Sequence, residues 1–456
     1  MRPTISITVI PRKSDNQSDS LVQISRQVIS QLHININNSE ALKIALGGSI
    51  INAKIQEIDQ TAAEIHIPET VLLELKLPFQ RYKFKVCYYA DLHLLQLGPV
   101  IALLTNFTVS DNKEPHFRSV HKFCEELHHG ISESGGFFYV FSYGQFPKNA
   151  FYLDNGKWLS AKLPLPDVIY NRIHSRKLEK SHSFNQFREQ LQTLAIPMFN
   201  DRFLSKWDVY EQIIQEDSLV PYIPETRIFS KSNLLDLVQK YESVFMKPVN
   251  GSQGRNIIKL FKIGENQYTF LFTLTDSLET GIRKLILEDL YEQIMPLLQN
   301  RIYLLQQGIT FASYDARTMD FRVLCHKNSL HQWVVTSIVA RVAAQGEFVS
   351  NLAKGGMILK PLKALKTVFS QKTAFEAYRN MKELALKVAE TVSYSEQGIT
   401  GELGIDLGID MNGKPWLIEV NSKPSKEFED SQSKIRPSAQ AIIQFCNQLA
   451  FERKFE

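Results

Sequence analysis

The chain has few cysteines, and their spacing excludes several classes of protein. Its 456 residues include only four, at Cys87, Cys124, Cys325 and Cys446. No CxxC pair and no Cys/His spacing of a zinc site is present, and a disulfide-rich secreted scaffold is excluded. We expect four reduced, mostly buried thiols, as in cytoplasmic proteins.

Long apolar runs and a strong excess of one charge are also missing. The most apolar stretch, LHLLQLGPVIALL at residues 92–104, is too short to cross a bilayer and contains His, Gln, Gly and Pro. The first residues, MRPTISITVIPRK, alternate like a strand and lack the apolar core of a signal peptide. A net charge of +4, from dispersed basic residues, does not indicate a nucleic-acid surface. We expect no membrane span, no nucleic-acid partner and a cytoplasmic location.

What is present is a chain of mixed α and β character, long enough for roughly three domains. Residues 1–112 read as short strands between turn signals, with one helix within 68–78, which predicts a β-rich module. Helices and strands alternate over 113–218, which predicts a parallel sheet. Residues 219–456 read as an α+β domain of catalytic type, in which the charged stretch 276–295 is predicted to be helical.

The stretch GIDLGIDMNGKPWLIEVN, at 404–421, predicts a β-hairpin. Asn-Gly at 412–413 is the strongest short-range signal for a two-residue turn. If Met411 then faces Lys414, Asp406 lies opposite Glu419. Asn421 shares the face of Glu419, because side chains alternate along a strand.

Two carboxylates placed side by side repel each other unless they are protonated, separated by water or bridged by a cation. Carboxylate and amide oxygens are the ligands that Mg²⁺ prefers, so Asp406, Glu419 and Asn421 are candidate metal ligands. The alternative is a solvent-facing polar stripe. If repulsion dominates, Glu419→Gln leaves the melting temperature of the unliganded protein equal or higher.

The segment FMKPVNGSQGRNI predicts a strand that ends at Lys247 and continues into a glycine-containing loop. Backbone N–H groups at Gly251, Ser252 and Gly254 could approach phosphate oxygens, and Lys247 would add a positive charge. No Walker A pattern is present. The alternative is an ordinary hairpin loop beside an exposed lysine.

Further polar groups occur in apolar strands and in two other segments. Arg322 and Arg341 lie inside apolar strands, where they could neutralise a phosphoryl group or simply occupy a wet face of a sheet. Asn351 lies in a loop, and Lys206 lies in a helix opened by a capping box at Ser205, where most lysines are only solvated.

The strand YLLQQGI could present Gln306, Gln307 and Ile309 to an adenine edge, or could be a plain buried strand.

In this order, the motifs resemble the ATP-grasp superfamily over residues 200–430. The most specific part is Asp406 followed by Glu419-Val420-Asn421. With RVAAQGEFVSNLAKGG and the β-rich front, the whole chain resembles the endospore coat-associated YheC/YheD group.

The resemblance implies an α+β and α/β multidomain fold: an N-terminal β-rich module, a pre-ATP-grasp-like domain and an ATP-grasp domain of two subdomains around a nucleotide. It implies ATP and one or two Mg²⁺ ions as cofactors. The implied nucleotide contacts are Lys206, Lys247, Gly251, Ser252, Gly254, Gln306, Gln307, Ile309 and Asn351. Arg322 and Arg341 would be catalytic, and Asp406, Glu419 and Asn421 would hold the metal.

Two positions depart from the pattern of the superfamily. Many members carry a basic residue two before the metal aspartate, where this chain has Gly404. The segment SKPSKEFED, which follows Asn421, lacks the glycine that often follows its proline. The negative charge of the transition state would therefore have to be stabilised by Arg322 and Arg341.

The function implied is an ATP- and Mg²⁺-dependent carboxylate–amine (or thiol) ligase that acts through an acyl-phosphate on unidentified substrates, with a link to spore-coat proteins. The alternative is a structural coat protein that keeps the fold and binds nucleotide without turnover. A metal nuclease explains neither the lysine–glycine loop nor the weak overall basicity.

Overall fold

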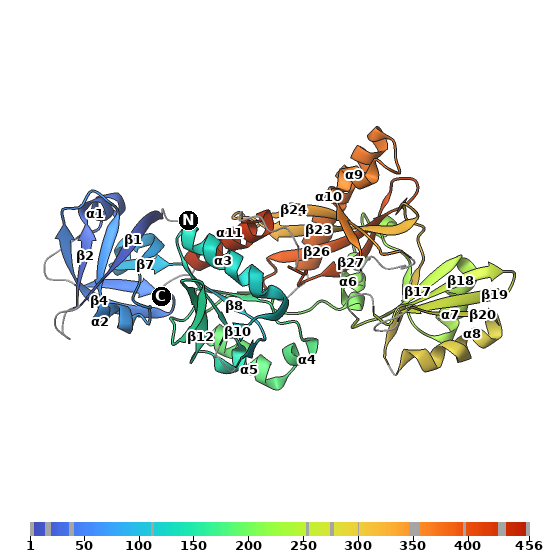
Figure 1. Ribbon diagram of the computed structural model, residues 1–456, viewed down its shortest axis with the longest axis horizontal. Coiled ribbons are helices and arrows are strands. Elements are labelled where there is room, and N and C mark those ends of the chain that lie inside the picture. Colours follow the sequence, from blue (N-terminus) through green and yellow to red (C-terminus); the bar gives the residue numbers. More distant parts are fainter. Residues whose placement is uncertain are drawn as a thin grey trace.

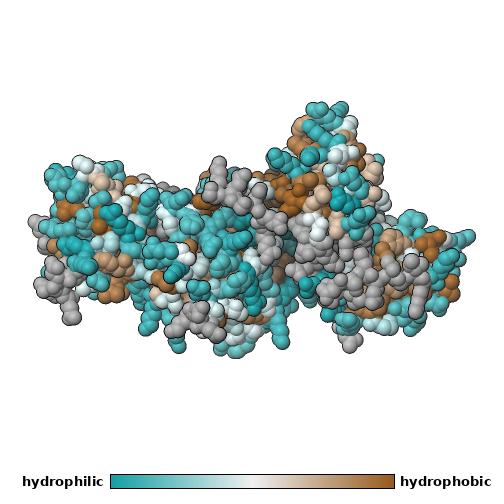
Figure 2. Space-filling view, viewed as in Figure 1, coloured by the Kyte–Doolittle hydropathy of each residue, from teal (hydrophilic) through white to brown (hydrophobic). Residues whose placement is uncertain are grey.

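The computed structural model describes residues 4–13, 20–35, 41–110, 114–251, 255–273, 278–299, 301–345, 355–394, 398–426 and 435–452. A closed barrel and three six-stranded sheets form an elongated row, with the barrel at one end and the sheet of β16–β21 at the other (Figure 1). The face in Figure 2 is largely hydrophilic over the barrel and the neighbouring sheet. Within the ranges above, no helix combines the length and apolarity needed to cross a membrane.

The barrel has the strand order β1-β5-β2-β4-β3-β7-β6. Alternate residues such as Ile7 and Val9 point into its core and are almost completely buried. The β-rich character predicted for this part is therefore present. The elements are β1 (Ile5–Arg12), β2 (Leu21–Ser25), α1 (Arg26–Leu32), β3 (Leu42–Leu46), β4 (Ser49–Ile58), β5 (Glu64–Pro68), α2 (Glu69–Glu74), β6 (Tyr82–Tyr89) and β7 (Leu94–Gly98).

The second sheet has the order β13-β12-β11-β8-β14-β15, and its central strands are parallel. Strands buried on both faces need continuous apolar runs, which Val100–Leu104 and Phe137–Phe141 supply. The elements are β8 (Val100–Leu104), α3 (His121–Ser134), β11 (Phe137–Phe141), β12 (Ala150–Asp154), β13 (Lys157–Ala161), β14 (Val168–Asn171), α4 (Arg176–Glu179), α5 (His182–Thr193) and β15 (Met198–Phe199), with β9 (Thr108–Val109) and β10 (Pro115–His116) forming a separate pair.

The third sheet is antiparallel, with the order β16-β21-β17-β18-β19-β20. Residues 278–286 form strand β20 and not the predicted helix, because they pair with β19 from Thr273↔Leu278 to Gln267↔Ile286. The helix begins only at Leu287. The elements are β16 (Thr226–Ile228), α7 (Lys231–Lys240), β17 (Ser243–Pro248), β18 (Ile258–Gly264), β19 (Gln267–Thr273), β20 (Leu278–Ile286), α8 (Leu287–Ile294) and β21 (Tyr303–Gln307).

The fourth sheet has the order β25-β24-β23-β26-β27. The small buried residues of α10, such as Ala377 and Ala385, share one core with the strand residues Phe321 and Ile405. Helix α11 contacts both α3 and β23, so it joins the second and fourth sheets (Figure 1). The elements are α6 (Lys206–Ile213), β22 (Ser313–Tyr314), β23 (Arg317–Lys327), β24 (Trp333–Val342), β25 (Met357–Leu359), α9 (Pro361–Leu365), α10 (Gln371–Tyr394), β26 (Glu402–Ile409), β27 (Pro415–Asn421) and α11 (Pro437–Glu452).

Candidate nucleotide site

A pocket of about 560 Å³ lies where the third sheet meets β27 and α6. Apolar side chains form most of its wall, and its charged groups are Lys206, Lys247 and Glu419. An apolar wall with a few convergent polar groups is typical of a small-molecule site. The lining residues are Lys206, Val209, Tyr210, Ile213, Ile223, Thr226, Lys247, Leu304, Gln306, Leu417, Ile418, Glu419 and Val420.

Lys247 and Gln306 reach the pocket from the neighbouring strands β17 and β21. The Nζ of Lys247 donates to Oε1 of Gln306 at 2.6 Å, and Nε2 of Gln306 donates to Oγ1 of Thr226 at 3.0 Å. Burial, and then the charge of Lys206, lowers the pKa of Lys247 to about 8. The chain therefore holds a lysine and an amide at fixed positions on the same wall.

Three other residues predicted to contact the nucleotide, Gln307, Ile309 and Gly251, do not line this pocket. The Oε1 of Gln307 accepts from the N–H of Glu225 at 3.2 Å, so this side chain is used within the sheet. Ile309 is half-buried beyond the end of β21, and Gly251 donates its N–H to the carbonyl of Pro248 at 3.0 Å. None of these three is among the lining residues given for the pocket. Ser252, Gly254 and Asn351 lie outside the described residues.

The hairpin brings Asp406 opposite Glu419, but not through the predicted turn. Asp410 pairs with Lys414, so the loop has three residues and is closed by Gly413 at φ 82°. A loop that is one residue longer than predicted would by itself shift the pairing of β26 with β27 by one residue, so that Asp406 would no longer face Glu419. A bulge at Ile418 shifts it back, because Leu407 pairs with Leu417 and Asp406 with Glu419.

Asp406 is buried beside two arginines, Arg322 from the neighbouring strand β23 and Arg341 from the next strand, β24. Arg322 donates two hydrogen bonds to it, one of them from Nη2 to Oδ2 at 2.8 Å, and Nη2 of Arg341 lies 3.1 Å from Oδ2. Burial alone would raise the pKa of Asp406, but Arg322 and Arg341 together hold it below its ordinary value. Burial likewise opposes the charge on Arg341, yet Asp406 and Asp320 keep the pKa of Arg341 raised.

Glu419 is paired with Lys206, the first residue of α6. Ser205 caps this helix by accepting from the N–H of Trp207 at 3.3 Å. The like charges of Asp406 and Glu419 are therefore each balanced by cationic side chains. The predicted metal is not needed to explain their proximity.

The donor set still suits a magnesium ion. The carboxylates of Asp406 and Glu419 are paired in register, and Nδ2 of Asn421 lies 3.4 Å from Oδ2 of Asp406. No three His, Cys, Asp or Glu side chains in the described ranges converge to hold a metal. Mg²⁺ typically takes one or two carboxylates and completes its shell with water and substrate phosphates. The residues present fit that incomplete shell.

Gly404 lies under the segment that follows the hairpin. A Cβ at this position would lie 2.7 Å from Cβ of Pro424 and 3.3 Å from Cδ of Arg322. The segment 422–426 folds back over the face of β26 that carries Asp406. This packing leaves no room for a side chain at position 404.

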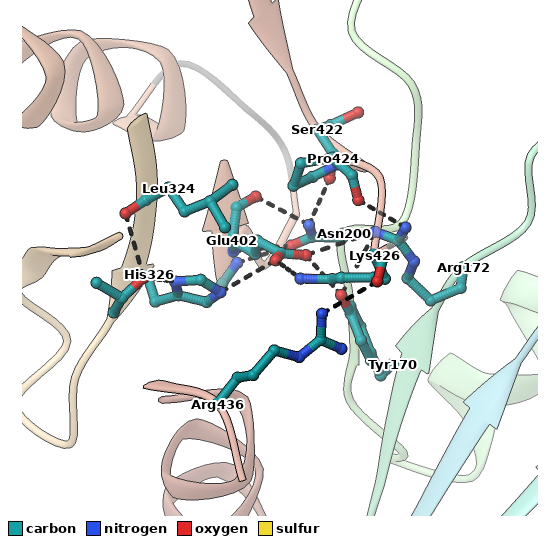
Figure 3. Close-up of polar contacts among 12 residues, drawn as sticks. Tyr170, Arg172, Asn200, Leu324, His326, Glu402, Ser422, Pro424, Lys426 and Arg436 are labelled. Atoms are coloured by element: carbon teal, nitrogen blue, oxygen red, sulfur yellow. Dashed lines mark hydrogen bonds and ion pairs between the residues drawn. The ribbon is translucent and has the colours of Figure 1, made fainter. Parts of the chain in front are cut away.

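Sequence analysis missed a buried polar cluster around Glu402, four residues before Asp406 (Figure 3). Tyr170 donates its hydroxyl to Glu402 at 2.5 Å, Nε2 of His326 lies 3.0 Å away, and Lys426 contacts the same carboxylate. Burial would raise the pKa of Glu402, but Lys426, His326 and Arg172 outweigh it and lower that pKa. The only sequence signal is a charged residue inside the apolar run GELGI.

The cluster ties the end of β27 to the second sheet. Nη2 of Arg172 donates to the carbonyl of Pro424 at 2.8 Å. Nδ2 of Asn200 donates to the carbonyls of Glu402 at 2.9 Å and Ser422 at 2.6 Å. Both strands of the hairpin are therefore held by residues from outside their own sheet (Figure 3).

Comparisons with known proteins identify the family of the chain. The profile of the YheC/D like ATP-grasp family matches residues 195–449. Endospore coat-associated protein YheD of Bacillus subtilis (strain 168) is 28% identical over 80% of this chain and 81% of its own length. YheC of the same organism is 24% identical over 59% of this chain and 74% of its own length. The D-alanine-D-alanine ligase from Coxiella burnetii matches with a TM-score of 0.45 and 9% identity, over 78% of this chain and 94% of that one.

Proposed function

Because the chain belongs to the YheC/D-like ATP-grasp family, we propose that it is an ATP- and Mg²⁺-dependent ligase that joins a carboxylate to an amine or a thiol. The observation that carries the proposal is the pocket between the third sheet and β27, where Lys206, Lys247 and Glu419 meet an apolar wall.

In this proposal the base of ATP packs on the apolar wall near Leu304 and Ile223, beside the amide of Gln306. Lys206 and Lys247 contact the phosphates, as point charges suited to oxyanions. Ser252, Gly254 and Asn351 remain predicted contacts. The proposal assigns no contact to Gln307, whose amide oxygen is used by Glu225.

Asp406, Glu419 and Asn421 would hold Mg²⁺, which would neutralise charge on the triphosphate when bound. Arg322, Arg341 and Lys206 would then exchange their carboxylate partners for phosphoryl oxygens. The arginine fork matches such oxygens with two parallel hydrogen bonds. The ion pairs of the free protein would thus keep both sets of groups in place before the nucleotide binds.

The reaction needs positioning and charge neutralisation more than covalent chemistry by the protein. An oxygen of the substrate carboxylate attacks the γ-phosphorus, and ADP leaves. The amine or thiol then attacks the carbonyl carbon of the acyl-phosphate; the C–O bond to phosphate breaks, and phosphate and a proton are released. Arg322 and Arg341 would stabilise the charge in both steps.

Calorimetry and product analysis test the proposal. We expect the purified chain to bind ATP with Mg²⁺, and to release ADP only when pooled amino acids and other carboxylates and amines are added. Absence of nucleotide binding by the wild type would overturn it.

The second candidate is a coat protein that binds nucleotide without turnover. It is favoured by the pairing of both hairpin carboxylates with cations, which gives the site a stable state of its own. Thermal stabilisation by ATP without ADP release, across wide substrate pools, would support this candidate.

We also propose association with spore-coat proteins, from the names of the relatives YheD and YheC. Recovery of a tagged chain in the coat fraction of spores would support this association, and recovery only in the core fraction would contradict it.

A further inference from the structure

The loop that follows β14, residues 172–175, and the first residue of α4, Arg176, carry three basic residues in the order Arg-Ile-His-Ser-Arg. It lies at the carboxyl end of a parallel strand, outside the 195–449 segment matched by the family profile. Carboxyl ends of parallel strands are common places for ligand-binding groups. The last of the three, Arg176, is the one that approaches the nucleotide site.

The first two residues of the loop, Arg172 and Ile173, are held by hydrogen bonds. Arg172 is fixed in the Glu402 cluster, where it donates to the carbonyl of Pro424 (Figure 3). The N–H of Ile173 donates to Oδ1 of Asn171 at 3.0 Å, and its carbonyl accepts from Lys423 at 3.1 Å. Ser175 then caps α4 by accepting from the N–H of Leu178 at 3.2 Å, so Arg176 begins a capped helical turn.

The guanidinium of Arg176 lies beside the start of α6. Its Nη1 donates to the carbonyl of Leu204 at 2.9 Å, two residues before Lys206, and its Cζ lies 4.9 Å from the centre of the Phe203 ring. Within the described part of the chain, no carboxylate lies within 4 Å of it. Lys206, Arg322 and Arg341 each have such a partner.

Leu204, which accepts from Arg176, is two residues before Lys206, the partner of Glu419. Burial lowers the pKa of Arg176, and among the carboxylates that oppose this shift Glu419 acts most strongly, before Glu179 and Asp208. Arg176 is not among the lining residues given for the pocket, whereas Lys206 and Glu419 are. Its contact with Leu204 places it beside the start of α6, the helix that carries Lys206 to the pocket.

A half-buried cation without a carboxylate partner is costly unless an anion compensates it. We infer that Arg176 binds an oxygen of the terminal phosphate of ATP, so that the domain before the family segment completes the phosphate site. This inference rests on the proposed function. A guanidinium with four N–H donors besides the one directed at Leu204 suits a phosphoryl group.

The test compares the binding of ATP and ADP, each with Mg²⁺, by calorimetry. For Arg176→Ala we expect ATP affinity to fall about tenfold to a hundredfold, as for a lost charged hydrogen bond, with ADP affinity nearly unchanged. Arg176→Lys should recover part of the loss. Lys177→Ala removes the adjacent, exposed cation of α4 and should bind both nucleotides like the wild type.

Unchanged ATP affinity in Arg176→Ala, or an equal loss for ATP and ADP, would overturn the inference and leave the proposed function standing. A wild type that binds neither nucleotide would overturn both. If Arg176→Ala does not fold, Arg176→Gln keeps the side-chain stem over Phe203 and is measured in its place.

Discussion

Asp406 and Glu419 carry the same charge on paired strands, and each is balanced by different cations. Arg322 and Arg341 hold Asp406, while Lys206 holds Glu419. The repulsion expected from the sequence is thus already compensated in the folded chain. This reverses the expected effect of neutralising Glu419 on stability, because the substitution leaves Lys206 without its partner.

For Glu419→Gln we expect the free energy of unfolding of the nucleotide-free protein to fall by about 0.5–1 kcal/mol, the scale of a partly exposed ion pair. Binding of ATP with Mg²⁺ should weaken at least about tenfold, since a charged ligand oxygen is lost. Urea unfolding and calorimetry measure the two effects. Glu211→Gln, on an exposed position of α6, is the matched control; a rise in stability in Glu419→Gln would contradict the compensation by Lys206.

Lys247 gives the site a pH dependence. Its pKa of about 8 lies below the ordinary value, so the folded chain loses this charge as pH rises through 8. ATP affinity should then fall between pH 8 and 9.5, by at most about tenfold per pH unit. In the free protein the same shift raises stability with pH between 8 and 10.5, because the unfolded state binds more protons there.

Calorimetry from pH 7 to 9.5 measures this effect. Lys247→Arg, which keeps its charge throughout, should not show the decline. An equal decline in that variant would assign the pH dependence to another group.

At the scale of elements, the sequence of the hairpin at 404–421 predicts its reversal and its main pairing but not the details of its loop. The Asn-Gly signal correctly predicts a reversal, and Asp406 pairs with Glu419 as counted from the predicted two-residue turn, although that turn is wrong. The loop is one residue longer than predicted, and the bulge at Ile418 compensates for it. Neither feature has a clear pattern in the sequence: the loop is closed by Asp410, whose Oδ1 accepts from Asn412 and Lys414 at 2.9 and 3.0 Å.

The other differences between prediction and structure concern β20 and Arg176, and both arise from contacts with residues far away in the sequence. Strand β20 was predicted as helix, since the edge of β19 that it joins is not visible in residues 276–295. Arg176 was missed because a loop of alternating basic and other residues resembles any solvated turn. Its position depends on contacts with Leu204 and Phe203, which only the fold brings near.

The packing of segment 422–426 on β26 makes Gly404 sensitive to any side chain. In Gly404→Ala the new Cβ would lie 2.7 Å from Pro424, a clash that we expect to cost about 1–3 kcal/mol of stability. Thermal unfolding measures it. Gly144→Ala, where a Cβ would meet nothing within 4 Å, is the control; equal stability of the two variants would contradict the tight packing.

At the scale of the molecule, the Glu402 cluster joins parts of the chain that are far apart in sequence. Tyr170 comes from β14 of the second sheet and Arg172 from the loop that follows it, His326 and Glu402 come from the fourth sheet, and Lys426 comes from the segment after β27 (Figure 3). Arg172, Glu402 and Lys426 are buried, so each of these charges is stabilised only by its partners in the cluster.

Glu402→Gln should therefore destabilise the protein by about 3–5 kcal/mol, because Arg172 and Lys426 stay buried without their counter-charge. Tyr170→Phe removes one hydrogen bond and should cost only about 1 kcal/mol. Urea unfolding of both variants checks the order. Similar losses would show that packing, and not charge, dominates the cluster.

The barrel lies at one end of the row of sheets, and the third sheet, which forms one wall of the pocket, lies at the other (Figure 1). For the proposed ligase, attachment through the outer wall of the barrel would leave the pocket accessible to small-molecule substrates. Anchoring and catalysis would then use separate parts of one polypeptide.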